Sequence, residues 1–339
     1  MALLFADGFE HYTTILNKWD LERGGTAAVV NSSYGRMSSS TGVRIAGTGH
    51  GLVKSLGVNA ATLIAGFAFK RPSVSVYDIV LCSFVDSSSV QCYLVLSATM
   101  SSLRWYRSTT QLVSIPVSMS YGLWYYVEVK ATFNNSTGSV ITKINNTQID
   151  STSSLDTCTT SNEYSTAFVL GEYGGTQAAS PTDYDDVYVC DTTGSYCNDF
   201  LNDRWIETVF PTGAGTTTDW TPSAGANWDC VEEVPPSSAQ YVETGVLNEI
   251  DTYACGNLTS TSGDIAAVVI NHYSAKTTAG ARKVSGAVYS DTDADVGTEN
   301  DLSTTYHNYQ SVSYLDPHTA AAWTIAGVNA AEFGVKLTT

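Results

Sequence analysis

Short runs in which apolar and polar residues alternate dominate this chain, and they predict strands rather than helices. The clearest case is 78–96, where two apolar-rich runs flank the turn-forming sequence DSSS. Folded about this turn, the hairpin sets Phe84 opposite Val90 and Cys82 opposite Cys92 on one apolar face. The two cysteines could form a cross-strand disulfide, although two buried thiols are favoured in a reducing compartment.

A second hairpin is predicted from 123–133 and 139–149, joined by the turn sequence NNSTG. Its first run alternates Val127 and Val129 with Tyr126, Glu128 and Lys130. Further strand-like runs lie at 27–31, 42–47, 62–70, 166–173 and 185–191. Short strands separated by clusters of turn residues indicate an antiparallel β-sandwich.

The pattern changes after residue 200. Residues 204–236 are rich in Gly, Pro and Thr, and strand-like runs resume at 264–276, 281–291 and 308–316. One short helix is predicted within 321–333, followed by a closing strand. We therefore predict an all-β chain with two domains, 1–195 and 196–339, the second being β-sandwich-like with one short helix.

Composition and charge restrict the partners. The chain of 339 residues is 43% hydrophobic and only 14% charged, with a net charge of −17. Residues 201–339 hold 17 acidic and 5 basic side chains, a balance of −12. Such a surface repels phosphate backbones, so we expect no nucleic-acid partner. No apolar run is long enough to span a bilayer, and the start MALLFADGFE lacks the basic region of a secretory signal.

The seven cysteines contain no C-x-x-C pair, which argues against a zinc site. Cys190 and Cys197 flank a short turn at the predicted domain boundary. A disulfide between them would tether this boundary and contribute about 2 kcal/mol by restricting the unfolded chain.

The strongest metal candidate is the acidic segment DTDADVGTENDL, residues 291–302. Asp291, Asp293 and Asp295 match the first, third and fifth ligand positions of an EF-hand loop. Val296 and Leu302 occupy the positions where that loop needs Gly and Glu, which excludes an EF-hand. A Ca²⁺ site in an acidic hairpin turn remains open as an expectation.

No short motif carries catalytic chemistry. The sequence contains no nucleophile elbow, H-E-x-x-H, P-loop or strand-bound G-x-G-x-x-G. Its five histidines are scattered, and no paired carboxylates stand at a spacing that suits glycoside hydrolysis. We therefore predict that the chain is not an enzyme.

Residues 1–195 resemble the laminin-G-like members of the concanavalin-A-like lectin and glucanase superfamily. The resemblance is carried by DGFEHY at 7–12, WYYVEVK at 124–130 and YDDVYV at 184–189. It implies a jelly-roll sandwich for the first domain. The E-x-D-x-x-E strand of the catalytic members is missing, so the resemblance implies no hydrolase activity.

The second region is similar to the C-terminal parts of virion structural proteins of tailed bacteriophages and prophages, through 210–228 and 316–337. This resemblance implies a structural protein on the particle surface, as head decoration, head fibre or tail appendage. Such a protein would be made in the host cytoplasm and would assemble with other virion proteins, as a homo-oligomer. Bacterial surface glycans are further expected partners.

The alternative is a lectin-like carbohydrate-binding module of a secreted or cell-surface protein. It would use the loop end or concave face of the sandwich and needs an exposed aromatic platform such as Trp105, Tyr106 or Tyr121. Candidate interface residues in the second region are Trp205, Trp220 and Trp228, since tryptophan is favoured at interface centres. Internal packing is the other interpretation of these tryptophans.

Overall fold

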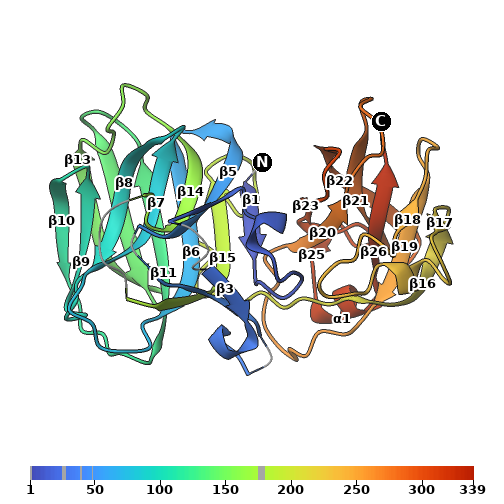
Figure 1. Ribbon diagram of the computed structural model, residues 1–339, viewed down its shortest axis with the longest axis horizontal. Helices are drawn as coiled ribbons and strands as arrows, with labels where there is room; N and C mark the ends of the chain where they lie inside the picture. The colour runs from blue at the N-terminus through green and yellow to red at the C-terminus, as the bar shows by residue number, and fades with distance from the viewer. Residues whose placement is uncertain (1, 25–27, 39, 48, 175–179) are drawn as a thin grey trace. The chain divides into compact units, whose positions relative to one another are not determined.

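The computed structural model describes residues 2–24, 28–38, 40–47, 49–174 and 180–339. The chain divides into two compact units, unit 1 at residues 1–206 and unit 2 at 207–339 (Figure 1). Almost all regular structure in the described residues is antiparallel β, with one short α-helix, which confirms the predicted fold class. None of the described helices is long and apolar enough to cross a membrane.

Unit 1 is a sandwich of two antiparallel sheets that face each other (Figure 1). The eight-stranded sheet has the order β13-β12-β11-β6-β15-β4-β3, with β1 also paired to β15. Its strands are β1 (Leu3–Asp7), β3 (Ala28–Asn31), β4 (Gly42–Ile45), β6 (Thr62–Lys70), β11 (Trp124–Thr132), β12 (Gly138–Ile144), β13 (Thr147–Leu155) and β15 (Thr182–Asp191).

The seven-stranded sheet has the order β10-β9-β8-β7-β14-β5-β2. Its strands are β2 (Leu21–Arg23), β5 (Gly51–Ala60), β7 (Ile79–Asp86), β8 (Ser89–Leu96), β9 (Ser102–Arg107), β10 (Thr110–Pro116) and β14 (Ser165–Gly171). Two single-turn 3₁₀ helices, η1 (Ile15–Asn17) and η2 (Ser32–Tyr34), lie in the connections. Hairpins of consecutive strands form the β13 and β10 ends of the two sheets, and strands distant in the sequence pair in their middle, as β6 with β15 and β5 with β14, as in a jelly roll.

The core of unit 1 fills the space between the two sheets. Phe67 and Val129 enter it from the eight-stranded sheet, and Phe84, Trp105 and Phe168 enter it from the seven-stranded sheet. Phe84 stacks on Trp105 with ring centroids 6.3 Å apart. The alternation in the sequence therefore selects the inward face of β11 correctly, whereas Val90 of β8, predicted to face inward, packs on the outward cluster that contains Val85 and Val169.

The hairpin of 78–96 forms, as β7 and β8, but its predicted register is wrong. Phe84 pairs with Cys92, and Cys82 pairs with Leu94, because β-bulges interrupt the ladder. The bulge holds Gln91, whose buried side chain accepts from the Thr159 backbone N–H at 2.7 Å. An extra residue on one strand shifts every pair beyond it.

The predicted strand 139–149 is two strands, β12 and β13. Asn145 and Asn146 have φ values of 47° and 68° and turn the chain between them. Asparagine tolerates the left-handed region better than most residues, so the Asn-Asn pair marks a tight hairpin turn.

The boundary between the units lies later than the predicted 195/196 division. The segment 196–206 belongs to unit 1 because it is hydrogen-bonded to that unit's strands and loops. Arg36 contacts the Asp203 carboxylate at 2.8 and 2.9 Å, and Glu128 on β11 accepts from the Asn202 backbone N–H at 2.8 Å.

Unit 2 is built on a five-stranded antiparallel sheet of order β16-β19-β26-β21-β22. Its strands are β16 (Pro211–Thr218), β19 (Ile250–Cys255), β21 (Lys283–Ser290), β22 (Asp293–Asp301) and β26 (Glu332–Leu337). Three two-stranded sheets complete it: β17 (Thr221–Pro222) with β18 (Val242–Glu243), β20 (Val268–Ser274) with β23 (His307–Ser313), and β24 (Leu315–Asp316) with β25 (Ala321–Ala322). A 3₁₀ turn, η3, spans Trp228–Cys230.

The sheet β20–β23 packs against the five-stranded sheet and gives unit 2 its sandwich character. Ile270 of β20 belongs to one buried cluster with Val288 of β21 and Phe333 of β26. Gly286 of β21 permits this approach, since a Cβ there would lie 2.8 Å from Ser311 Cβ and 2.9 Å from Ile270 Cβ. The Gly286 backbone N–H donates to Ser311 Oγ at 2.8 Å.

The helix α1 spans only Ile325–Ala330, within the predicted range 321–333. Thr324 has an extended backbone and caps the helix by accepting from the Gly327 backbone N–H at 3.0 Å, so the helix begins after it. The residues after the helix join the sheet as β26, in which Phe333 and Val335 are buried in the core.

Candidate functional site

The outward face of the seven-stranded sheet carries a group of aromatic and charged side chains that strand pairing places in one row. Strand pairing places one residue from each strand in a continuous row across this face. From β10 to β2 the row is Gln111, Tyr106, Tyr93, Ser83, Val169, Val53 and Leu21. With strands about 4.8 Å apart, the row is roughly 29 Å long.

Tyr93 and Tyr106 form the aromatic part of this row. They are direct cross-strand partners, and their rings stack with centroids 5.5 Å apart and planes 17° from parallel. Both rings are partly exposed. Burial, followed by the nearby Tyr106 and Glu172, raises the pKa of Tyr93, so its hydroxyl stays protonated and donates to the Ser108 carbonyl at 2.6 Å.

An arginine lies beside the tyrosine pair. Arg104 of β9 is two residues before Tyr106 and therefore lies on the same face. Its guanidinium contacts Asp78 at 2.6 Å and the Tyr106 hydroxyl at 3.3 Å. The same hydroxyl is 3.2 Å from Gln111 Oε1. This network fixes a charged group and a phenol side by side at the surface.

The middle of the row is closed. Val53, Val85, Ala167 and Val169 form a buried cluster on this outward face, and Tyr173 packs on it. Arg23 in turn lies 4.0 Å from the centre of the Tyr173 ring. A hollow of about 530 Å³ lies over β5 and β14 and is lined by Val53, Ala167 and Tyr173 of this cluster. The stacked aromatic pair lies at the other end of the row, with Gln111, Tyr106 and Tyr93.

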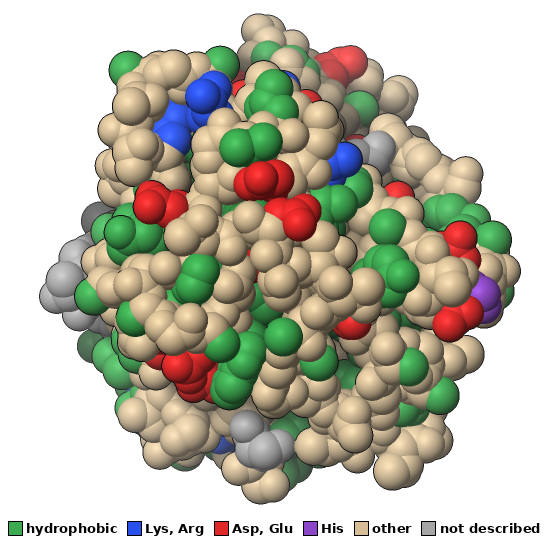
Figure 2. Space-filling view, turned by 90° about the vertical axis from the view of Figure 1, so that its right-hand side faces the viewer, with side chains coloured by type: hydrophobic (Ala, Val, Ile, Leu, Met, Phe, Trp, Pro, Cys, Tyr) green, Lys and Arg blue, Asp and Glu red, His purple; other side chains and the backbone are tan. Residues whose placement is uncertain are grey.

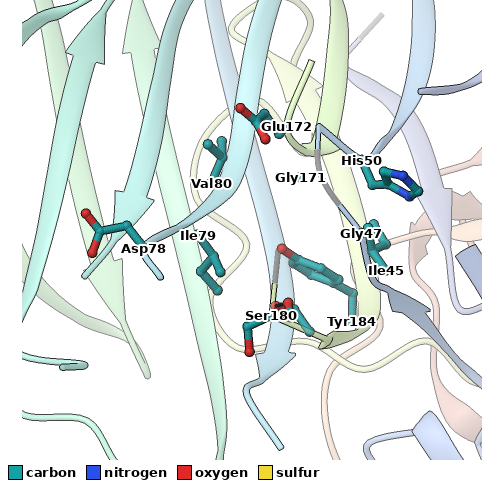
Figure 3. A pocket seen from close by; sticks show the side chains of 11 residues that line it. Ile45, Gly47, His50, Asp78, Ile79, Val80, Gly171, Glu172, Ser180 and Tyr184 are labelled. Atoms are coloured by element: carbon teal, nitrogen blue, oxygen red, sulfur yellow. Dashed lines mark hydrogen bonds between the residues drawn. The ribbon is translucent and has the colours of Figure 1, made fainter. Parts of the chain in front are cut away.

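A small pocket lies at the end of the sandwich where β7 begins and β14 ends (Figure 3). The side chains of His50, Asp78 and Glu172 surround it, and Tyr184 reaches into it from β15. Its volume of about 30 Å³ holds one or two water molecules and no sugar ring. It is therefore too small to be a glycan-binding site.

Buried carboxylates gather at a different place, near the start of β15. Burial and the neighbouring Asp185 raise the pKa of Glu10 to about 9. Burial and Asp186 raise the pKa of Asp185 to about 8, and burial raises that of Asp186 to about 6. Arg36 lies 3.4 Å from Asp186. Glu10 belongs to the motif DGFEHY, and Asp185 and Asp186 belong to the motif YDDVYV.

The structure does not assemble the predicted Ca²⁺ site. Asp291 and Asp293 lie at the β21–β22 turn, where each faces one ring nitrogen of His318, at 3.3 and 2.8 Å. Asp295 instead accepts from its neighbour's backbone N–H at 2.9 Å. Across the described residues, no group of three or more His, Cys, Asp or Glu side chains is placed to hold a metal.

None of the cysteines is joined in a disulfide, and all seven lie within the described residues. Cys82 and Cys92 are both buried. The Cys190 thiol donates to the Asp199 carbonyl at 3.7 Å, and burial raises the pKa of both Cys190 and Cys197. The tether predicted between these two is absent from the structure.

The predicted aromatic residues have different environments. Trp105 is fully buried and donates to Thr142 at 2.9 Å, and Tyr121 packs against the core, so neither offers a platform. Tyr106 does face outward. Among the interface candidates Trp205 is 53% exposed, whereas Trp220 packs on a buried cluster and donates to the Glu249 carbonyl at 3.2 Å. Trp228 lies in η3 and is partly buried.

Tyr93 and Arg104 are not among the site residues predicted from the sequence. Alternation in SLRWYR does indicate that Arg104 and Tyr106 share the face opposite Trp105. No local signal pairs Tyr93 with Tyr106, because that contact depends on the register between β8 and β9.

No family model matches the sequence, and no curated protein is similar to it. Among solved structures, the chain is similar to alginate lyase Aly36B, at 12% identity and a TM-score of 0.35, over 50% of this chain and 86% of that one. It is also similar to the cellulose-induced protein Cip1, at 13% identity and a TM-score of 0.39, over 55% of this chain and 96% of that one. A sialidase from Trypanosoma rangeli matches at 12% identity and a TM-score of 0.32, over 44% of this chain and 25% of the sialidase.

These similarities correct one prediction. The prediction that the chain is not an enzyme is wrong, since solved structures similar to it include a lyase and sialidases. Residues from separate strands can make an active site without leaving a short motif in the sequence. Likeness at this level assigns no reaction to the chain.

Proposed function

We propose that this chain is a surface component of a tailed-phage particle that contacts glycans through the outward face of the seven-stranded sheet in unit 1. The observation that carries glycan contact is the stacked, partly exposed pair of Tyr93 and Tyr106 beside the Arg104–Asp78 ion pair. Aromatic rings offer an apolar surface to the C–H face of a sugar ring, and the adjacent polar groups can bond its hydroxyls.

The virion part of the proposal is supported by the resemblance of residues 210–228 and 316–337 to virion structural proteins. Only 14% of the residues are charged, and on the face that Figure 2 shows charged side chains occupy a small part of the surface. Mass spectrometry of purified particles tests this part. Absence of the chain from particles of a phage that encodes it would contradict the virion assignment and would leave glycan binding to be tested separately.

Glycan binding is expected to be weak for a single chain and to gain strength when many copies are displayed together. Replacing Tyr106 by alanine removes one ring of the stacked pair, and we expect the dissociation constant to rise roughly fivefold to tenfold. The measurement is affinity electrophoresis of the full chain in gels that contain alginate, galactomannan or dextran.

Two variants serve as controls for Tyr106→Ala. Tyr106→Phe keeps the ring and should retain most of the binding, while Tyr196→Ala removes a tyrosine that is 45% exposed elsewhere on unit 1 and should bind normally. Equal retardation of the wild type and Tyr106→Ala in every gel would contradict the assignment of this face.

A further inference from the structure

The two-stranded sheet β20–β23 of unit 2 has one buried and one outward face. Its strands pair residue by residue, and directly paired residues share a face. Ile270 and His272, with their partners Ser311 and Tyr309, face the five-stranded sheet, where Ile270 belongs to the core. Asn271 and Tyr273 alternate with them and therefore face outward, each together with its partner.

The outward face carries a second stacked tyrosine pair. Tyr273 and Tyr306 have ring centroids 5.1 Å apart and planes 22° from parallel, and both are partly exposed. Burial, followed by the nearby Tyr241, Tyr273 and Glu243, raises the pKa of Tyr306. Tyr241, which is 37% exposed, therefore lies close to the same pair. Three tyrosines gather at the start of β23.

Amide side chains continue the surface beyond the tyrosines. Gln310 Nε2 donates to Asn271 Oδ1 across the strands at 2.8 Å. Asn308 is the cross-strand partner of Tyr273 and is only 5% exposed. Its Nδ2 is buried without a hydrogen-bond partner among the described residues, so Asn308 lies beneath the exposed surface and does not contact a ligand there.

The residues of this surface, which we call the tyrosine face, are Tyr241, Asn271, Tyr273, Tyr306 and Gln310. None of them is charged at neutral pH, and unit 2 as a whole holds 16 acidic and 4 basic side chains. Such a domain repels anionic ligands, whereas aromatic rings and amides suit the C–H faces and hydroxyls of a neutral sugar.

We propose that the tyrosine face of unit 2 is a second glycan-binding site, selective for neutral sugars. The ligand class rests on the proposed function, but the residues belong to a different unit and to a different sheet. Two weak sites on one chain would raise the effective concentration of a polymeric glycan at each of them.

The test uses the full chain in affinity gels that contain galactomannan or dextran as neutral polymers. Tyr306→Ala is expected to weaken binding of at least one neutral polymer roughly fivefold to tenfold, and Tyr241→Ala to weaken it by a smaller factor. Tyr306→Phe and Tyr196→Ala should bind as the wild type does. Circular dichroism melting verifies that each variant is folded.

The outcomes separate this site from that of unit 1. Loss in Tyr306→Ala with normal binding in Tyr106→Ala supports the tyrosine face and shows that the unit 1 site does not bind the neutral polymer; the alginate gel then decides the unit 1 site. Loss in Tyr106→Ala alone overturns the tyrosine face and leaves the unit 1 site standing. Loss in each single variant, with a larger loss in the double variant, supports both sites. No binding of either neutral polymer by the wild type also overturns the tyrosine face.

Discussion

Replacing Asp7 by asparagine is expected to destabilise unit 1 by roughly 3–5 kcal/mol. Asp7 is fully buried at the end of β1 and accepts from Lys18 Nζ at 3.1 Å and from Trp19 Nε1 at 2.8 Å. The Phe9 backbone N–H and the Tyr12 hydroxyl also donate to it. Lys18 is itself only 1% exposed, so the variant would leave a buried ammonium group without its carboxylate.

Hydrogen–deuterium exchange during urea unfolding measures this effect for each unit separately. The double variant Asp7→Asn/Lys18→Met should recover part of the loss, because it removes the uncompensated charge as well. The matched control is Asp20→Asn, which breaks the more exposed ion pair with Lys54, 3.2 Å long, and should cost less than about 1 kcal/mol. An Asp7→Asn variant as stable as this control would contradict the role of the buried pair.

Raising the pH from 5 to 9 is expected to lower the melting temperature of unit 1 by at least about 5 °C. Glu10, Asp185 and Asp186 have folded-state pKa values of about 9, 8 and 6, above their ordinary range. The folded protein therefore holds protons that the unfolded chain has released. The contribution of these three carboxyl groups to stability is full at and below their ordinary pKa of about 4 and falls as the pH rises towards 9.

The variant Glu10→Gln tests the cause of this slope. It removes the group with the highest of the three pKa values, so the decrease between pH 7 and 9 should become smaller. Glu163→Gln, at an exposed position, should keep the wild-type slope. The scan is run in EDTA, because a bound divalent cation would offset the repulsion. Stability that stays constant or rises from pH 5 to 9 in EDTA would contradict this account.

Strands and their inward faces were predictable because alternation is local. The hairpin of β7 and β8 follows from two apolar runs around a turn, and the burial of Phe84 follows from its place in the alternation. The register was not predictable, since the bulge at Gln91 is fixed by hydrogen bonds to residues 159–164, far along the chain. The boundary at 206 likewise depends on Arg36 and Glu128, distant partners of the connecting segment.

The candidate site was predictable in part for the same reason. Tyr106 faces outward and Trp105 inward, as the sequence SLRWYR implies once the core side is known. The row across seven strands combines residues from 21 to 111, and its order follows from the jelly-roll topology rather than from any local pattern. The ion pair of Arg104 with Asp78 joins β9 to the residue just before β7, a strand that is not its neighbour in the sheet, so local pattern could not reveal it either.

The most direct test of glycan contact on unit 1 is hydroxyl-radical footprinting of the full chain, read by mass spectrometry. The chain is labelled alone and with saturating alginate, galactomannan or dextran. The account predicts that at least one polymer protects both Tyr93 and Tyr106, while Tyr196 is labelled equally with and without it. Unchanged labelling of Tyr93 and Tyr106 with all three polymers would contradict it.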